Sequence, residues 1–296
     1  MGAPASPQPG RPPAQHPGEP GVFAGAGPPF APDDPGLRWL FQLDRLGIRP
    51  GLERIRGLLA ALDHPERGLR TVVVAGTNGK GSTTRLLAAL ARAAGHRTAC
   101  YTSPHLLRVH ERLEIDGEPC APDRFAAMAA RLRPDVERLE ASWFESVTAI
   151  ALALARADGV EVLCCEAGLG GRLDATNALP AAATVLTSVA LDHEQILGGT
   201  LAEIAAEKLG LLKRGSPLFC AVAPELRPQV FAAAVAAGSP VHFLEEQARC
   251  EERGETWDLV TRRGVVAGLP AGPAGPAAWG RRNAALALLC WQELAA

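Results

Sequence analysis

From Leu37 onward, short apolar runs alternate with longer alanine-rich segments. The short runs have the length of buried strands, and the longer segments place apolar residues at helical spacing. The predicted strands are 71–75, 98–101, 160–165, 183–188 and 217–221, and the predicted helices are 37–46, 51–62, 82–94, 122–140, 145–157, 200–212, 226–237 and 282–294. Because strands and helices alternate, we predict an α/β fold with a mostly parallel sheet and helices on both faces.

Three stretches depart from this alternation. Residues 1–36 are crowded with proline and glycine and contain almost nothing that forms a core, which predicts a disordered tail. Residues 108–117 are expected to form a short excursion followed by a turn, and 241–270 a few short strands around Gly254 and Gly264. The domain prediction is therefore a tail, 1–36, and one folded unit, 37–296.

The composition favours small-molecule ligands over macromolecular ones. Hydrophobic residues make up 47% of the 296 residues, which is ample for a core. The 30 basic and 32 acidic residues nearly cancel, so the net charge of -2 gives no reason to expect nucleic acid or an anionic membrane as a partner. Arginine or aspartate interrupts even the alanine-rich segments, so we predict no membrane span and a soluble, cytoplasmic protein.

Cysteine spacing supports the same compartment. The chain has neither a CxxC pair nor a compact cysteine framework, and several cysteines lie in apolar runs. We expect reduced core thiols rather than disulfides. The seven positions are Cys100, Cys120, Cys164, Cys165, Cys220, Cys250 and Cys290.

The segment Val72–Thr84 carries the clearest chemical signal, because an apolar run leads directly into the glycine-rich turn GTNGKGS. Glycines let backbone N–H groups converge on phosphate oxygens, and the following helix points its positive end at the anion. Lys80 supplies a cation for the outer phosphates, so ATP or a close relative is the expected ligand. The predicted nucleotide-binding residues of the turn are Thr77, Asn78, Gly79, Lys80, Gly81, Ser82 and Thr83.

Four later segments, read with this loop, resemble one family. They are YTSPHL at 101–106, CEAGLGGRLDATN at 165–177, TSVALDHEQILG at 187–198 and EKLGLLKRGSP at 207–217. Together with the loop they closely resemble the folylpolyglutamate synthase/dihydrofolate synthase branch of the Mur ligase family, in order from about Gly51 to Ala296. The resemblance implies the central-domain fold of Mur ligases, with ATP and Mg²⁺ as cofactors.

A magnesium ion is needed to offset the charge of a nucleotide triphosphate. Glu166 ends a predicted buried strand, which is a standard place for a metal-binding carboxylate, although a capping or ion-pairing role is the alternative. The resemblance implies that Ser103 and His193 join Glu166 at the metal. Considered alone, His193 would be a structural residue more readily than a Mg²⁺ ligand, because imidazole is softer than the ligands Mg²⁺ usually selects.

The resemblance also implies the reaction. A carboxylate on a pteroate or folate attacks the γ-phosphate of ATP to give an acyl phosphate and ADP, and the amine of L-glutamate then displaces phosphate to form an amide. Lys80, the loop amides and Mg²⁺ would stabilise the transferred group, and Ser82 and Thr83 would hold metal or phosphate. Lys208 matches a lysine that is carbamylated in the family, with an ordinary exposed helix lysine as the alternative. The implied catalytic residues are Lys80, Lys208 and His193.

The resemblance assigns the pterin-bearing substrate to three places along the chain. Phe144 has a ring that can pack on a flat heterocycle, and Asp174 can pair with an amino group of the ligand or hold its own loop. Arg49-Pro50 and Trp143 differ from the residues common in the family and affect the expected substrate preference. The implied substrate-binding residues are Gly51, Leu52, Phe144, Glu145, Leu173, Asp174 and Ala175.

The largest departure from the family lies at the end of the chain. Asn283 matches an asparagine expected on the adenine side of ATP, but the family continues into a C-terminal domain with a D-x-x-H-N-P segment, which this sequence lacks. Two functions therefore stay open. One is an ATP-dependent amide ligase that acts with a C-terminal domain, which a separate chain could supply. The other is a truncated or split nucleotide-binding module without ligase activity of its own.

Overall fold

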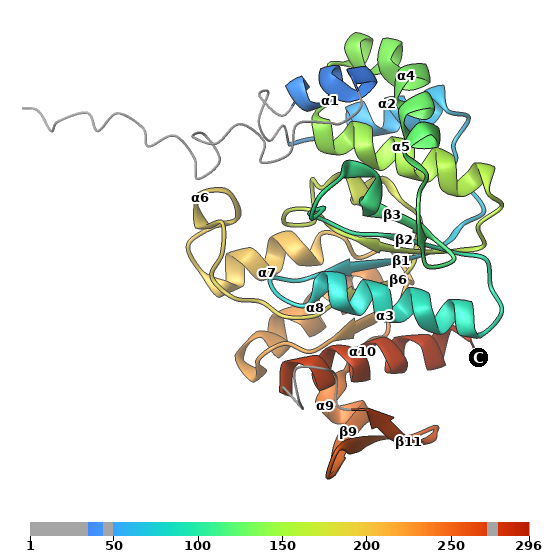
Figure 1. The fold of residues 1–296 in the computed structure, drawn as a ribbon. Helices are drawn as coiled ribbons and strands as arrows, with labels where there is room; N and C mark the ends of the chain where they lie inside the picture. The colour runs from blue at the N-terminus through green and yellow to red at the C-terminus, as the bar shows by residue number, and fades with distance from the viewer. Residues whose placement is uncertain (1–34, 44–49, 271–277, 296) are drawn as a thin grey trace, which may run out of the picture. The chain divides into compact units, whose positions relative to one another are not determined.

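The computed structural model describes residues 35–43, 50–270 and 278–295 (Figure 1). The predicted disordered tail lies outside the described residues except for Pro35 and Gly36, which belong to a short 3-10 helix, η1 (Pro35–Leu37). The end of the predicted helix 37–46 also lies outside them, after α1 (Arg38–Gln42). No helix in the described ranges is long and apolar enough to cross a membrane.

An eight-stranded sheet organises the described fold, in the order β4-β3-β2-β5-β1-β6-β7-β8. Six neighbouring strands, β2, β5, β1, β6, β7 and β8, pair in parallel. The remaining two, β3 and β4, pair antiparallel at one edge of the sheet. The predicted mostly parallel sheet is therefore confirmed. The strands are β1 Arg70–Ala75, β2 Thr98–Tyr101, β3 Leu113–Ile115, β4 Glu118–Pro119, β5 Val162–Glu166, β6 Ala181–Leu186, β7 Leu218–Cys220 and β8 Val241–Phe243.

Helices cover both faces of this sheet (Figure 1). Successive residues of the central strands therefore face different cores. Val72 and Val74 of β1 face the core under α3 and α10, whereas Val73 faces the core that includes α7 and α8. In β5, Leu163 faces the core under α2, α4 and α5. The helices are α2 Glu53–Ala61, α3 Lys80–Ala93, α4 Pro122–Leu139, α5 Trp143–Ala157, α6 Glu194–Leu197, α7 Leu201–Leu209, α8 Arg227–Ala237, α9 Leu244–Gln247 and α10 Ala278–Leu294.

The few short strands predicted at 241–270 are also confirmed. Besides β8, they form an antiparallel sheet of β9 (Ala248–Arg253), β10 (Thr256–Thr261) and β11 (Gly264–Pro270). Trp257 and Leu259 point from β10 into the core shared with α10. One cysteine prediction is wrong: Cys250 lies exposed on β9, while the other six thiols are buried and all seven are free.

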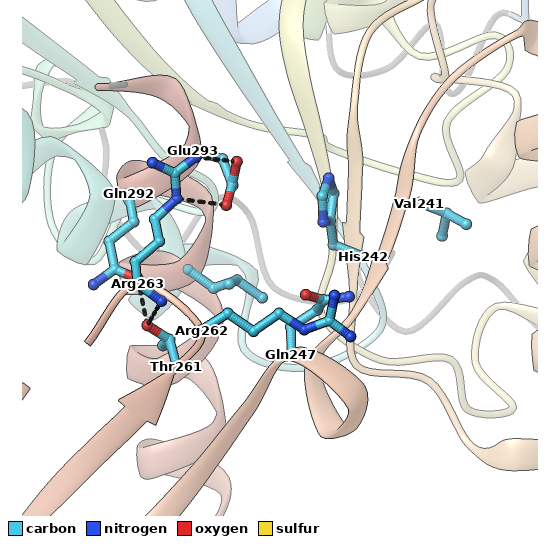
Figure 2. Close-up of a pocket in the computed structure, with 9 residues that line it drawn as sticks. Val241, His242, Gln247, Thr261, Arg262, Arg263, Gln292 and Glu293 are labelled. Carbon is cyan, nitrogen blue, oxygen red and sulfur yellow. Dashed lines mark hydrogen bonds and ion pairs between the residues drawn. The ribbon is translucent and has the colours of Figure 1, made fainter. Parts of the chain in front are cut away.

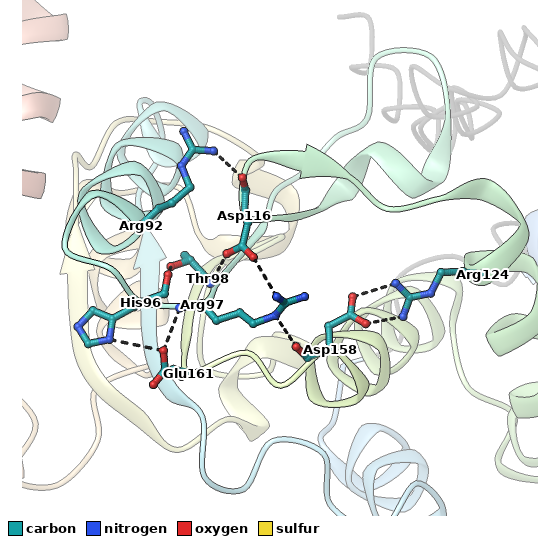
Figure 3. Close-up of polar contacts among 8 residues, drawn as sticks. All are labelled: Arg92, His96, Arg97, Thr98, Asp116, Arg124, Asp158 and Glu161. Atoms are coloured by element: carbon teal, nitrogen blue, oxygen red, sulfur yellow. Dashed lines mark hydrogen bonds and ion pairs between the residues drawn. The ribbon is translucent and has the colours of Figure 1, made fainter.

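A cluster of charged residues lies at the end of the sheet where β2 and β5 begin (Figure 3). The backbone N–H of Arg97 donates to Glu161, and its side chain donates to the carbonyl of Asp158, at 2.9 and 2.5 Å. Arg124 of α4 donates two hydrogen bonds to the same aspartate, at 2.9 and 2.6 Å. This cluster connects α4, the end of α5 and the start of β5. It lies at the amino ends of the strands, whereas the predicted motifs follow their carboxyl ends.

Candidate functional site

A tight turn joins β1 to α3 and forms the centre of the site. The turn begins at Gly76, with φ of 147°, and ends at Gly79, with φ of 85°, so both glycines adopt backbone conformations that L side chains rarely take. A Cβ on Gly76 would stand 2.0 Å from the hydroxyl of Thr187. Only glycine fits there. Gly79 directly precedes α3, which begins at Lys80, two residues earlier than predicted.

The segment after β6 braces this turn. The Thr187 hydroxyl donates to the Asn78 carbonyl at 2.7 Å, and Ser188 Oγ accepts from the Asn78 N–H at 3.0 Å. The Thr77 hydroxyl exchanges hydrogen bonds with the backbone of Ala190, at 3.2 and 3.0 Å. These bonds explain why β6 ends at Leu186 and not at the predicted residue 188. They also mean that Thr77 uses its hydroxyl to hold the turn.

The turn opens into a cavity of about 450 Å³, the loop cavity. Lys80 lines it, and its ammonium donates to the Thr77 carbonyl at 3.1 Å. The cavity brings together most of the predicted nucleotide-binding residues and two of the three predicted metal ligands. Its lining comprises Thr77, Asn78, Gly79, Lys80, Gly81, Ser82, Arg85, Ser103, Pro104, His105, Leu106, Glu111 and Glu166.

The two predicted hydroxyls of α3 have different surroundings. Ser82 lines the loop cavity, whereas Thr83 is fully buried and does not. The Thr83 hydroxyl has no hydrogen-bond partner among the described residues. Ser82 is therefore the hydroxyl that can reach a ligand in the cavity as it stands.

Glu166 ends β5 directly against the turn. Its Oε2 accepts the Ser103 N–H at 2.9 Å and would lie 3.2 Å from a Cβ on Gly81. Burial raises the pKa of this carboxyl, while the Ser103 N–H and Lys80 act in the opposite direction. A buried carboxylate beside the hydroxyls of Ser82 and Ser103 is an oxygen donor set of the kind that Mg²⁺ prefers. The residues present therefore fit a magnesium ion.

His193, the third predicted metal ligand, is not brought to this cavity. Its side chain is 54% exposed, and Nε2 lies 3.7 Å from the neighbouring Asp192. It also takes a left-handed backbone conformation, with φ of 49°. No group of three metal-ligating His, Cys, Asp or Glu side chains gathers anywhere in the described ranges. The structure thus joins Ser103 with Glu166 but leaves His193 on an exposed segment.

Lys208 lies under the turn and is not an exposed helix lysine, so that alternative is wrong. Its side chain is buried, and Nζ donates to the Gly76 carbonyl at 3.0 Å. Burial, with repulsion from Lys80 as the next cause, lowers the pKa of Lys208 to about 8. The lowered pKa enlarges the neutral fraction of the amine relative to an exposed lysine, and the neutral amine is the form that reacts with CO₂.

Asn283 brings α10 into contact with the turn. The side chain is buried, and its amide nitrogen and oxygen would each lie 2.6 Å from a Cβ on Gly79. Asn283 does not line the loop cavity itself. The contact therefore places α10 beside the start of α3, as the two adjacent helices in Figure 1 show.

A second cavity of about 400 Å³, the Phe144 cavity, collects the predicted substrate residues. Phe144, Glu145, Leu173, Asp174 and Ala175 line it, and Pro50 lines it in place of Gly51 and Leu52. Its remaining lining comprises Ser142, Trp143, Gly168, Leu169, Arg172, Ile196, Leu197 and Glu207.

Two acids of the Phe144 cavity have structural partners. Asp174 accepts the N–H groups of Leu169 and Thr176 at 2.9 and 3.0 Å, so it holds its own loop, as one of the two alternatives predicted. Glu145 caps α5 by accepting from the N–H and hydroxyl of Ser142 at 2.8 and 2.6 Å. Both carboxylates keep the walls of the cavity in place.

A third cavity, of about 280 Å³, lies far along α10 from Asn283, and none of the predicted site residues lines it (Figure 2). Arg263 donates to both oxygens of Glu293 there, at 2.8 and 2.7 Å, and the His242 ring stacks on Phe219 with centroids 4.7 Å apart.

One residue of the loop cavity, His105, was not identified from the sequence. Its signal was present in the TSPH segment, beside Ser103.

Comparisons with known proteins agree with the resemblance. No protein-family model matches the chain. The dihydrofolate synthase/folylpolyglutamate synthase of Bacillus subtilis is 39% identical over 191 residues, which cover 62% of this chain and 44% of that protein. The enzyme of the same description from Mycobacterium tuberculosis is 38% identical over 62% of this chain and 41% of its own length. The chain thus spans less than half the length of these relatives.

Solved structures extend the similarity to most of the chain. Escherichia coli FolC in complex with DHPP and ADP matches with a TM-score of 0.78 and 32% identity, over 88% of this chain and 62% of that one. Mycobacterium tuberculosis folylpolyglutamate synthase complexed with ADP and AMPPCP matches with a TM-score of 0.74 and 32% identity, over 86% and 61% of the two chains. The predicted fold is therefore confirmed.

Proposed function

We propose that this chain binds Mg-ATP and forms part of an ATP-dependent amide ligase. The proposal starts from the homology between the chain and the dihydrofolate synthase/folylpolyglutamate synthases. The ligase would add L-glutamate to dihydropteroate or to a reduced folate through an acyl phosphate. Relatives bound to ADP, AMPPCP and DHPP support this choice of ligands. Residues 37–296 would form its ATP-binding domain.

The observation that carries the proposal is the closeness of the two cavities. Glu166 lines the loop cavity, and Gly168, two residues later, lines the Phe144 cavity. Two residues of extended chain span at most about 7 Å. A nucleotide in the first cavity and an acceptor in the second would therefore have their reacting groups near one another.

The residues of the loop cavity suit phosphoryl transfer. Lys80 and the backbone N–H groups of the turn would bind the outer phosphates of ATP and stabilise charge on the transferred group. Glu166, Ser82 and Ser103 would hold Mg²⁺, which offsets the negative charge of the phosphates when bound. Asn283 would bind on the adenine side, next to Gly79.

The remaining predicted residues keep their proposed roles with less support. Phe144 would pack on the heterocycle of the acceptor, since its ring lines the Phe144 cavity. Lys208 would act as a carbamate, which its buried position and lowered pKa favour. His193 would reach the metal only after the exposed segment around it moves. We further propose that a C-terminal ligase domain, on this or a separate chain, completes the glutamate site in the cytoplasm.

Glutamate-dependent ADP release by the purified chain tests this function. The assay contains Mg²⁺, ATP and either dihydropteroate or tetrahydrofolate, with Lys80→Ala as the blank because that variant lacks the ammonium of the turn. Release above the blank with one acceptor supports the ligase and identifies its substrate. No release by a chain that binds Mg-ATP would contradict an independent ligase and favour a nucleotide-binding module.

A further inference from the structure

His105 lines the loop cavity together with Lys80 and Glu166. It follows Ser103 and Pro104 on the segment that leaves β2. The carboxylate of Glu111 accepts three backbone N–H groups of this segment, from Leu106, Leu107 and Arg108, at 2.9 to 3.2 Å. The segment that carries His105 is therefore held in one conformation at the mouth of the cavity.

Arg112 determines which nitrogen of the His105 ring carries a proton. Its Nε donates to His105 Nδ1 at 3.1 Å. A guanidinium has only donors, so Nδ1 must accept, and the single proton of the neutral ring lies on Nε2.

Arg112 also connects the ring to the second cavity. It is only 7% exposed, and its guanidinium carbon lies 4.5 Å from the ring centroid of Trp143. The ring centroids of His105 and Trp143 are 6.1 Å apart. Because Trp143 lines the Phe144 cavity and His105 lines the loop cavity, the three side chains form one layer between the two cavities.

We propose that His105 donates its Nε2–H to an oxygen of the phosphoryl group during its transfer from ATP to the acceptor, and that Arg112 positions the ring. This inference rests on the proposed function. In the step, an acceptor carboxylate oxygen forms a bond to the γ-phosphorus, the bond from that phosphorus to the bridging oxygen breaks, and ADP leaves with the electron pair. No proton is transferred, so the step is assisted by oriented donors and cations, and the Nε2–H of His105 is one such donor.

Affinity for a phosphoryl-transfer analogue tests this role without requiring ligation. Calorimetry compares ADP with ADP–AlF₄⁻, both with Mg²⁺, for the full chain and its variants. His105→Phe keeps a ring but loses the donor, and we expect it to weaken ADP–AlF₄⁻ binding about 100-fold, the usual effect of removing one such donor. Its ADP affinity should stay within about threefold. His105→Gln replaces the donor with an amide N–H and should recover most of the loss, and Arg131→Gln, an exposed position on α4, is the control.

The role of Arg112 has its own spectroscopic test. In ¹⁵N NMR spectra of the histidine rings, the parent should show His105 as the neutral tautomer with its proton on Nε2, and Arg112→Lys should show a mixture of tautomers and weaker ADP–AlF₄⁻ binding. Equal analogue affinity in the parent and His105→Phe would overturn the inference, and an unchanged tautomer in Arg112→Lys would overturn the positioning role. A parent that binds neither ADP nor ATP in the presence of Mg²⁺ would instead contradict the proposed function, because that function begins with nucleotide binding by this chain.

Discussion

Replacing Gly79 by alanine should separate backbone strain from the contact between the glycine-rich turn and α10. Gly79 has φ of 85°, and an added Cβ would stand 2.6 Å from the amide atoms of Asn283. Left-handed backbone costs an L residue about 1–2 kcal/mol. Overpacking a well-filled site typically adds about 1–3 kcal/mol, with the lower value if the carboxamide rotates away. Gly79→Ala should therefore lower the free energy of unfolding by about 2–5 kcal/mol.

Gly95 offers a matched control at the other end of α3. Its φ is 90°, almost the same as at Gly79, but a Cβ there would meet nothing within 4 Å. Gly95→Ala should thus cost only the backbone strain of about 1–2 kcal/mol. Combining Gly79→Ala with Asn283→Ala should bring the cost of the glycine change down to the same value, because the clashing carboxamide is gone.

Urea unfolding of the parent, the three single variants and the double variant measures these free energies by linear extrapolation. The slope against urea must stay constant for the comparison to hold. If Gly79→Ala costs the same with and without Asn283, or no more than Gly95→Ala, then the contact between the turn and α10 does not contribute and our reasoning is refuted. Mg-ATP titration should show a larger loss for Gly79→Ala than for Gly95→Ala.

Three further changes test other parts of the site. Without Mg²⁺, Glu166→Gln should leave the melting temperature equal or higher, because burial penalises the ionised carboxylate. The same change should weaken Mg²⁺ binding about tenfold or more, since a contact to a charged group contributes about 1.5–3 kcal/mol. An unaltered metal titration would mean that the carboxylate is structural. Burial lowers the pKa of Lys208 in the folded chain from 10.5 to about 8, so the unfolded chain binds more protons between these two pH values. The parent should therefore gain stability relative to Lys208→Met as the pH rises from 8 to 10.5. The similar pKa shift of Lys213 cancels in this comparison, because both proteins contain that lysine. Parallel pH curves would contradict the burial of Lys208. Gly168→Ala would place a Cβ 2.6 Å from Phe144 and 2.9 Å from Asp174, so it should weaken acceptor binding and leave Mg-ATP binding intact; acceptor titration checks this, and a loss of both affinities would argue for a general disruption.

The sequence predicted the elements of this fold well and their ends less well. The alternation of apolar runs with helical segments anticipated the sheet and its covering helices, because strand and helix periods are written locally in the chain. The ends of α3 and β6 shifted by two residues because contacts from distant segments decide them. Gly79 lets α3 start early, and the side chains after Leu186 form hydrogen bonds that hold the glycine-rich turn.

By itself, the sequence determined that the chain has an α/β fold with a glycine-rich turn suited to phosphate, because glycine spacing, one lysine and the following helix are neighbours along the chain. Only the tertiary structure decided which distant side chains reach that turn. It buries Lys208 under Gly76, 132 residues away, and it fixes the tautomer of His105 through Arg112. It leaves His193 exposed. Burial and contacts between distant residues depend on how the elements pack, and no local pattern of residues encodes that packing.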